Sequence, residues 1–62
     1  MSQYLDEYDV AEALEADVKD VIELIQYGVL PARRDSDGWA IAERDLRRFR
    51  AQWGNDVAAA LE

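Results

Sequence analysis

The side chains best suited to chemistry in this sequence are charged, and the two signs of charge are unevenly divided along it. Residues 1–31 contain eight Asp or Glu residues and one basic residue, Lys19, whereas residues 32–62 contain six acidic residues and six arginines. The first half therefore carries the whole formal net charge of −7. Arginine guanidinium groups bind phosphate oxygens, while carboxylates repel polyanions. This division favours binding to a charged macromolecule.

Catalysis and metal binding are not expected. The sequence has no His and no Cys, so it lacks the commonest general base, the commonest metal ligand and any thiolate. Residues 35–38, Asp-Ser-Asp-Gly, resemble part of a calcium loop, but Arg33 and Arg44 occupy the positions of its first and last ligands, so a turn is favoured. We expect a protein that is not an enzyme, with no catalytic site, metal or cofactor.

Length and composition predict one small folded domain. The chain has 62 residues, of which 50% are hydrophobic and 34% charged, which is typical of a folded rather than a disordered chain. No apolar run approaches the roughly 20 residues that a transmembrane helix requires. A basic start followed by an apolar stretch, the mark of a secretory signal, is also missing. We therefore expect a cytoplasmic protein without membrane association.

Two short helices are expected in the acidic half. Asp6, with Asp9 three residues later, is a helix-start pattern and predicts a helix to about Leu14. Asp17 repeats the pattern, and Gly28 supplies a residue that commonly ends a helix. The apolar residues of this second helix have amphipathic spacing: Val18, Val21, Ile22 and Ile25. Because only two residues join the helices, we expect them to cross steeply.

The second half predicts a hairpin and a third helix. Residues 29–34 can form a strand, residues 35–38 a turn and residues 39–41 a returning strand. A helix is expected from about Ala42 to Trp53, and its apolar face comprises Ala42, Leu46, Phe49 and Trp53. We place the domain at residues 4–53 and expect residues 54–62 to be a tail or a short helical turn.

The aromatic side chains are expected to serve mainly as core. Trp39 and Trp53 have spacings that favour packing over base stacking. Tyr4 and Tyr8 are expected to cover the N-terminal edge of the core. Tyr27, at the end of the second helix, fits either a surface anchor or packing beneath the hairpin.

The predicted elements follow the order helix, tight turn, helix, hairpin and helix. Particular residues recur at defined spacings within this order. These are Tyr4-Leu5, Ala11, Leu14, Val21, Leu24-Ile25, Gly28, Leu30-Pro31-Ala32, Gly38-Trp39, Ile41, Asp45-Leu46 and Phe49. In this pattern, the chain resembles the excisionase and MerR-like winged helix-turn-helix DNA-binding domains. The resemblance implies a mainly α fold with a small β-hairpin wing. It further implies a DNA-binding regulator of transcription or an excisionase-like accessory factor, with double-stranded DNA as its partner.

The resemblance also assigns site residues. In such domains the second helix enters the major groove and the hairpin wing follows the phosphate backbone. Mapped onto this chain, the DNA-binding residues are Lys19, Glu23, Gln26, Tyr27, Arg33 and Arg34. Arg44, Arg47 and Arg48 form a ridge at i, i+3 and i+4 that either adds backbone contacts or is a solvated face. On the second interpretation, these arginines pair with nearby acids: Asp35, Glu43 and Asp45.

An alternative keeps the fold and changes the partner. Relatives usually carry Ser, Thr and Arg on the second helix, whereas this one carries Asp17, Asp20 and Glu23. The acidic helices could therefore dock on a basic protein such as a recombinase, and complementary charge would accelerate that encounter. A homo-oligomer, in which the acidic half of one copy binds the arginine-bearing half of another, is a third hypothesis.

Overall fold

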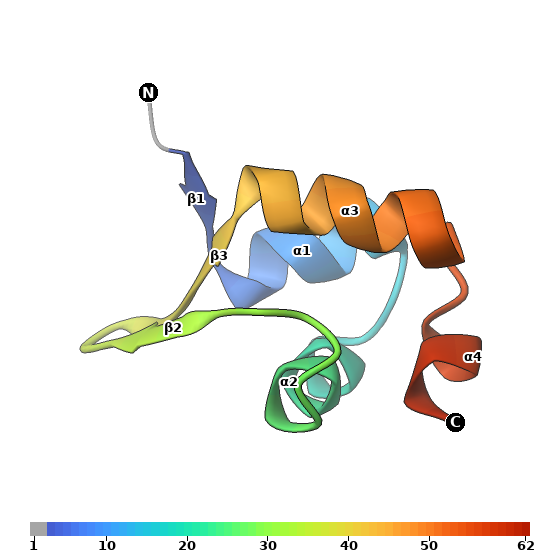
Figure 1. Cartoon of the computed structure of the whole chain (residues 1–62). Helices are drawn as coiled ribbons and strands as arrows, with labels where there is room; N and C mark the ends of the chain where they lie inside the picture. The colour runs from blue at the N-terminus through green and yellow to red at the C-terminus, as the bar shows by residue number, and fades with distance from the viewer. Residues whose placement is uncertain (1–2) are drawn as a thin grey trace.

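The computed structural model describes residues 3–62, which contain four helices and three strands (Figure 1). In chain order the elements are β1 (Tyr4–Leu5), α1 (Glu7–Leu14), α2 (Val18–Gln26), β2 (Arg33–Asp35), β3 (Gly38–Ala42), α3 (Glu43–Trp53) and α4 (Val57–Leu61). The predicted mainly helical fold with a β-hairpin is confirmed, and the sheet has one strand more than predicted. None of the helices within residues 3–62 combines the length and apolarity needed to cross a membrane.

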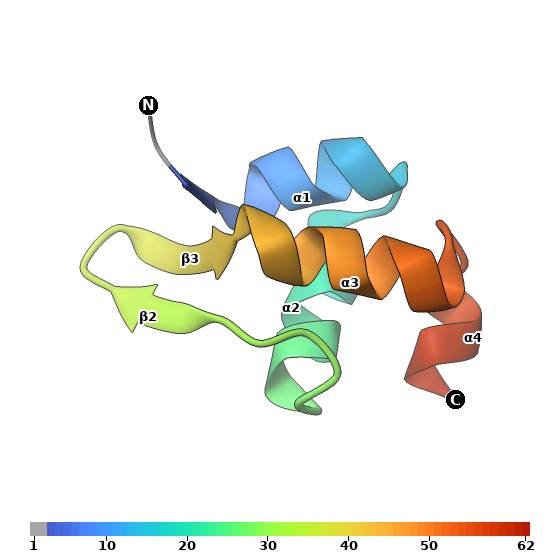
Figure 2. The same cartoon turned by 45° about the horizontal axis from the view of Figure 1, so that its top comes forward.

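Local capping sets both ends of α1. The backbone N–H of Asp9 donates to Asp6 Oδ1 at 2.7 Å, and the N–H of Asp6 donates to Asp9 Oδ2 at 3.4 Å, which closes a capping box. The helix ends at Glu15, whose φ of 55° is left-handed, and the N–H of Ala16 then donates to the carbonyl of Ala11 at 2.9 Å. This abrupt reversal turns the chain at once, so α2 runs across α1 rather than back along it (Figure 2).

The second helix begins and ends where the sequence predicts. Asp17 occupies its N-cap position, although the carboxylate makes no capping hydrogen bond. Gly28 follows the helix with a φ of 77°, a conformation that costs glycine little. The N–H groups of Val29 and Leu30 both donate to the carbonyl of Leu24, at 2.9 and 3.1 Å. This termination directs Leu30 into the core, where its side chain is almost fully buried.

The sheet is antiparallel in the order β1-β3-β2. β2 begins at Arg33, later than predicted, because the preceding residues bury Leu30 and include Pro31, which has no N–H to donate. β1 was not predicted, since two residues are too short for an alternating pattern to be visible. It exists through its partner: Tyr4 pairs with Ala42, and the N–H of Glu43 donates to the carbonyl of residue 3 at 2.9 Å.

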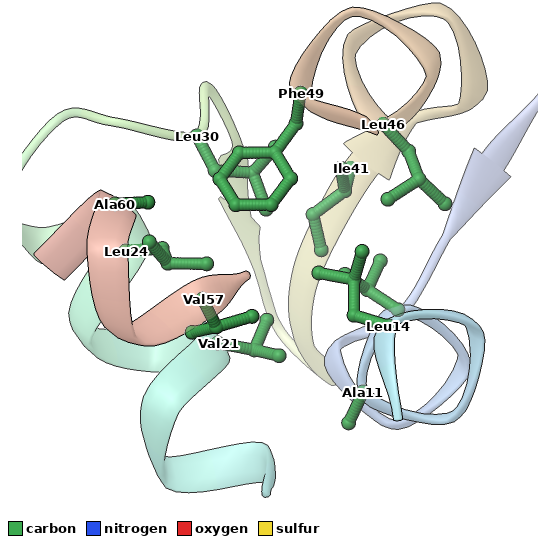
Figure 3. Packing of buried hydrophobic residues seen from close by; sticks show 11 residues of the cluster. Ala11, Leu14, Val21, Leu24, Leu30, Ile41, Leu46, Phe49, Val57 and Ala60 are labelled. Carbon is green, nitrogen blue, oxygen red and sulfur yellow. The ribbon is translucent and has the colours of Figure 1, made fainter. Parts of the chain in front are cut away.

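One hydrophobic core joins the four helices and β3 (Figure 3). Its buried members are Val10, Ala11, Leu14, Val21, Leu24, Leu30, Ile41, Leu46, Phe49, Val57 and Ala60. The last two belong to α4, which Asp56 caps by accepting from the N–H of Ala59 at 3.2 Å. Of the two alternatives for residues 54–62, a tail or a short helical turn, the structure has the helical one, and this helix also supplies part of the core.

The structure confirms some of the predictions for the aromatic residues and contradicts others. Trp39 and Trp53 are partly buried and pack against the core, as expected. The prediction for Tyr4 and Tyr8 was wrong, because they are 48% and 66% exposed. The inward face of α1 is formed by Val10, Ala11 and Leu14, and at about 100° per residue Tyr8 lies away from it. Tyr27 is a surface residue, with 69% of its side chain exposed.

Replacing Glu15 by Gly should stabilise the fold. Glycines aside, Glu15 is the one residue within 3–62 that has a positive φ, and a left-handed conformation strains a residue with a Cβ. We expect Glu15→Gly to raise the free energy of unfolding by roughly 0.5–1 kcal/mol in urea denaturation. Glu15→Gln removes the same charge but keeps the Cβ, so it should remain near wild type. If Glu15→Gly and Glu15→Gln had the same free energy of unfolding, the left-handed conformation of Glu15 would not be strained.

Candidate nucleic-acid interface

The hairpin is built by its own turn residues. Asp35 Oδ1 accepts from the N–H of Asp37 at 3.0 Å, which folds the two-residue loop between β2 and β3. Gly38 follows with a φ of 133°, which L side chains rarely adopt. The turn fixes the register, so that Arg33 lies opposite Ala40 and Arg34 opposite Trp39. Both arginines therefore lie on β2, which is an edge strand, and both are exposed.

The register places the two arginines on opposite faces of the sheet, since successive strand residues point to opposite sides. Tyr4, Ala42, Ala40 and Arg33 share the outer face. The other face contains the buried core residue Ile41, and its members are Leu5, Ile41, Trp39 and Arg34. The hairpin thus offers one cationic group to each side.

Each arginine is held by an aromatic ring. The guanidinium carbon of Arg33 lies 5.7 Å from the ring centroid of Tyr4, and that of Arg34 lies 5.0 Å from the ring centroid of Trp39. Cation–π contacts at exposed sites contribute about 0.5–1 kcal/mol each. The contacts restrict both side chains while leaving them accessible to solvent. An anionic partner would therefore meet guanidinium groups whose conformational freedom is already reduced.

One carboxylate of the acidic half anchors the hairpin to α1. β1 ends at Leu5, so β3 has no strand partner beside Trp39 on that edge. The N–H of Trp39 instead donates to Glu7 Oε1 at 3.3 Å. A Cβ at Gly38 would lie 2.9 Å from the other carboxylate oxygen, so glycine also leaves room for this contact. Glu7 therefore has a structural role that sequence analysis did not assign.

The predicted residues of α2 reach the surface, but that surface is acidic. Lys19, Gln26 and Tyr27 are exposed and Glu23 is half-buried, while the helix packs its other side against α1 and α4. Lys19 is outnumbered by the acids of the same segment: Asp17, Asp20 and Glu23. At ~5 Å and an effective dielectric constant of ~20, each carboxylate–phosphate pair would cost about 3 kcal/mol before screening by salt. Electrostatics therefore opposes the approach of a polyanion to α2.

The predicted arginine ridge of α3 divides between two flanks of the helix. Arg44 and Arg47 line a surface hollow of about 430 Å³ together with Tyr4. Arg48 borders a separate hollow of about 180 Å³ with Asp45 and Trp53. Arg44 and Arg47 therefore share a surface with the hairpin through Tyr4, and Arg48 does not.

Sequence analysis missed two residues of this surface. Tyr4 had been assigned to the edge of the core, and only strand pairing reveals that it lies beside Arg33. Arg50 had been assigned no role, although it lines a hollow together with Arg47. The three-residue spacing of Arg44, Arg47 and Arg50 was the signal that could have identified it.

Comparison with known proteins adds no assignment. The chain matches no protein-family model, no curated protein and no solved structure. Within residues 3–62, no group of three or more acidic side chains is arranged so that it could hold a metal ion. A functional interpretation therefore depends on the residues and their geometry.

Removing the Glu7 carboxylate should loosen the hairpin. In Glu7→Ala the N–H of Trp39 loses its acceptor, so its hydrogen exchange, followed by NMR, should accelerate roughly five- to tenfold relative to wild type. Glu7→Gln keeps a side-chain oxygen as acceptor and should retain most of the protection. Glu12→Ala, at an exposed position of the same helix, serves as control. Equal exchange in Glu7→Ala and Glu12→Ala would refute the anchoring role.

Proposed function

We propose that this chain is a small DNA-binding protein of the excisionase/MerR-like winged helix-turn-helix type, whose hairpin contacts the phosphate backbone. The observation that carries the proposal is the pair of exposed guanidinium groups of Arg33 and Arg34, one on each face of an edge strand and each held over an aromatic ring. Guanidinium groups bind phosphate oxygens through several directed hydrogen bonds. An exposed hairpin with ordered arginines suits the role that a wing has in such domains.

The arrangement of the first two helices supports the same proposal. α1 and α2 meet at a sharp corner at Glu15, and the hairpin follows α2 after a short loop. This order agrees with the resemblance seen in the sequence. A domain of 62 residues offers few phosphate contacts, so we infer an accessory factor that binds DNA beside other proteins or other copies.

A second candidate function uses the opposite charge. Three carboxylates of α1 and of the corner after it are exposed and have no structural role comparable to that of Glu7; they are Glu12, Glu15 and Asp17. An exposed anionic surface of this kind suits docking on a basic protein such as a recombinase, because complementary charge accelerates association. The acidic helices and the hairpin are separate surfaces. One molecule could therefore bind DNA and a basic protein together.

The DNA-binding proposal is tested by anisotropy titration of labelled duplex DNA. We expect binding in ~50 mM salt that weakens steeply towards ~200 mM. The double variant Arg33→Gln, Arg34→Gln should bind about tenfold more weakly, and the slope of log K against log salt should fall by about 1–2. A variant that keeps the charge, Arg33→Lys with Arg34→Lys, should retain most of that slope. The proposal fails if the wild-type chain does not bind duplex DNA in ~50 mM salt.

Neutralising exposed acids distinguishes the two candidate functions, because the expected effects have opposite signs. In the triple variant Glu12→Gln, Glu15→Gln, Asp17→Asn, reduced repulsion should strengthen DNA binding about two- to fivefold in ~50 mM salt. The same variant should lose co-elution with a basic DNA-binding domain on size exclusion, measured without DNA. In ~500 mM salt the difference in DNA affinity between the triple variant and wild type should disappear, which provides an internal control. Unchanged co-elution with the basic domain would count against the second candidate.

A further inference from the structure

A row of arginines follows the outer side of the molecule from the hairpin to the end of α3. Arg33 stacks on Tyr4, and Tyr4 lines one surface hollow with Arg44 and Arg47. Arg47 also lines the next hollow, of about 650 Å³, with Arg50. These shared neighbours make the surface continuous. We call it the basic stripe, and it consists of Arg33, Tyr4, Arg44, Arg47 and Arg50.

The fold of α3 explains why these arginines lie together. Leu46 and Phe49 point from α3 into the core (Figure 3). At about 100° per residue, side chains three positions apart lie on neighbouring parts of one helix flank. Arg44, Arg47 and Arg50 follow this interval, and all three are exposed.

The basic stripe has a charge opposite to that of the chain. It contains four arginines, and two acids accompany it, Glu43 in the first hollow and Asp35 two residues after Arg33 on the same face of β2, which gives a local charge of about +2. The chain as a whole has a net charge of −7. Positive charge concentrated on one side of an acidic protein is complementary to a polyanion that approaches from that side alone.

We propose that the basic stripe binds the phosphate backbone of duplex DNA, and that α2, unlike the second helix of the domains that the chain resembles, stays outside this interface. The inference rests on the proposed function and assigns its main contact surface. From Arg44 to Arg50 the helix rises about 9 Å, and from β2 to β1 the sheet spans about 10 Å. The width of the sheet runs across the axis of α3 (Figures 1 and 2), so each stretch by itself matches the axial rise of about three nucleotides of one strand.

The position of α2 agrees with this assignment. α3 and α2 lie on opposite sides of the core (Figures 1 and 3). A duplex that follows the outer side of α3 therefore faces away from the acidic surface of α2. This geometry separates the phosphates from Asp17, Asp20 and Glu23, and it leaves the acidic helices accessible.

The two hairpin arginines should then differ in importance. Arg33 lies on the outer face of the sheet and belongs to the basic stripe, whereas Arg34 lies on the opposite face over Trp39. Arg48 provides a matched control on α3 itself, because it lies on the other flank beside Asp45. Lys19 provides the control on α2.

The experiment compares variants in anisotropy titrations with a random-sequence duplex of about 20 base pairs in ~50 mM salt. The triple variant Arg44→Gln, Arg47→Gln, Arg50→Gln should bind at least about tenfold more weakly, with a salt slope lower by about 2–3. The corresponding triple Lys variant keeps the charges and should bind nearly as well as wild type. Arg48→Gln and Lys19→Gln should each change affinity less than about twofold. Circular dichroism checks that each variant keeps its helices.

Three outcomes would overturn the inference, and they are distinguishable. If the triple Gln variant binds like wild type while the hairpin variants bind weakly, the basic stripe is not the interface and the proposed function stands. If Lys19→Gln weakens binding as much as the triple variant does, α2 enters the groove. If the wild-type chain does not bind duplex DNA, the proposed function and the inference fail together.

Discussion

The hydrogen bonding of β3 along both of its edges is the constraint on which the other elements depend. One edge pairs with β2 and forms the hairpin, while the other pairs with β1 and so holds the segment that leads into α1. Where β1 ends, the carboxylate of Glu7 takes the place of a strand by accepting from the N–H of Trp39. Ile41, in the middle of β3, is fully buried, and the strand continues directly into α3. Backbone groups in such a position need partners, so β3 fixes its neighbours in space.

This constraint also separates the charges. The acidic helix α2 lies on the opposite side of the core from α3, and β3 leads the chain directly into α3, which carries four of the six arginines (Figure 1). The strand register then brings Arg33 to Tyr4 on the outer face. A chain with a net charge of −7 thereby has a cationic surface, and salt screening confines the electrostatic field of that surface to its own surroundings. Charges that would partly cancel in a mixed surface therefore remain apart.

Much of the fold could be predicted because its signals are local. The capping pattern of Asp6 and Asp9 identified α1, Gly28 identified the end of α2, and the Asp-rich turn identified the hairpin. The interface was less predictable. Arg33 and Arg34 were placed in the hairpin by its turn pattern, whereas helical spacing alone did not show that Arg44 and Arg47 border one hollow and Arg48 another. The strand β1 and the core role of α4 escaped prediction because each is too short to have a pattern of its own.

The sequence by itself determined where helices start and stop, where the chain reverses and how charge is divided between its halves. These properties depend on residues within a few positions of one another, through capping, turn preferences and backbone freedom. Tertiary structure alone decided that Tyr4 lies beside Arg33, that Glu7 anchors the hairpin and that Val57 closes the core. Each of these contacts joins segments far apart in the chain. Their formation depends on how the elements pack as a whole, which no local pattern encodes.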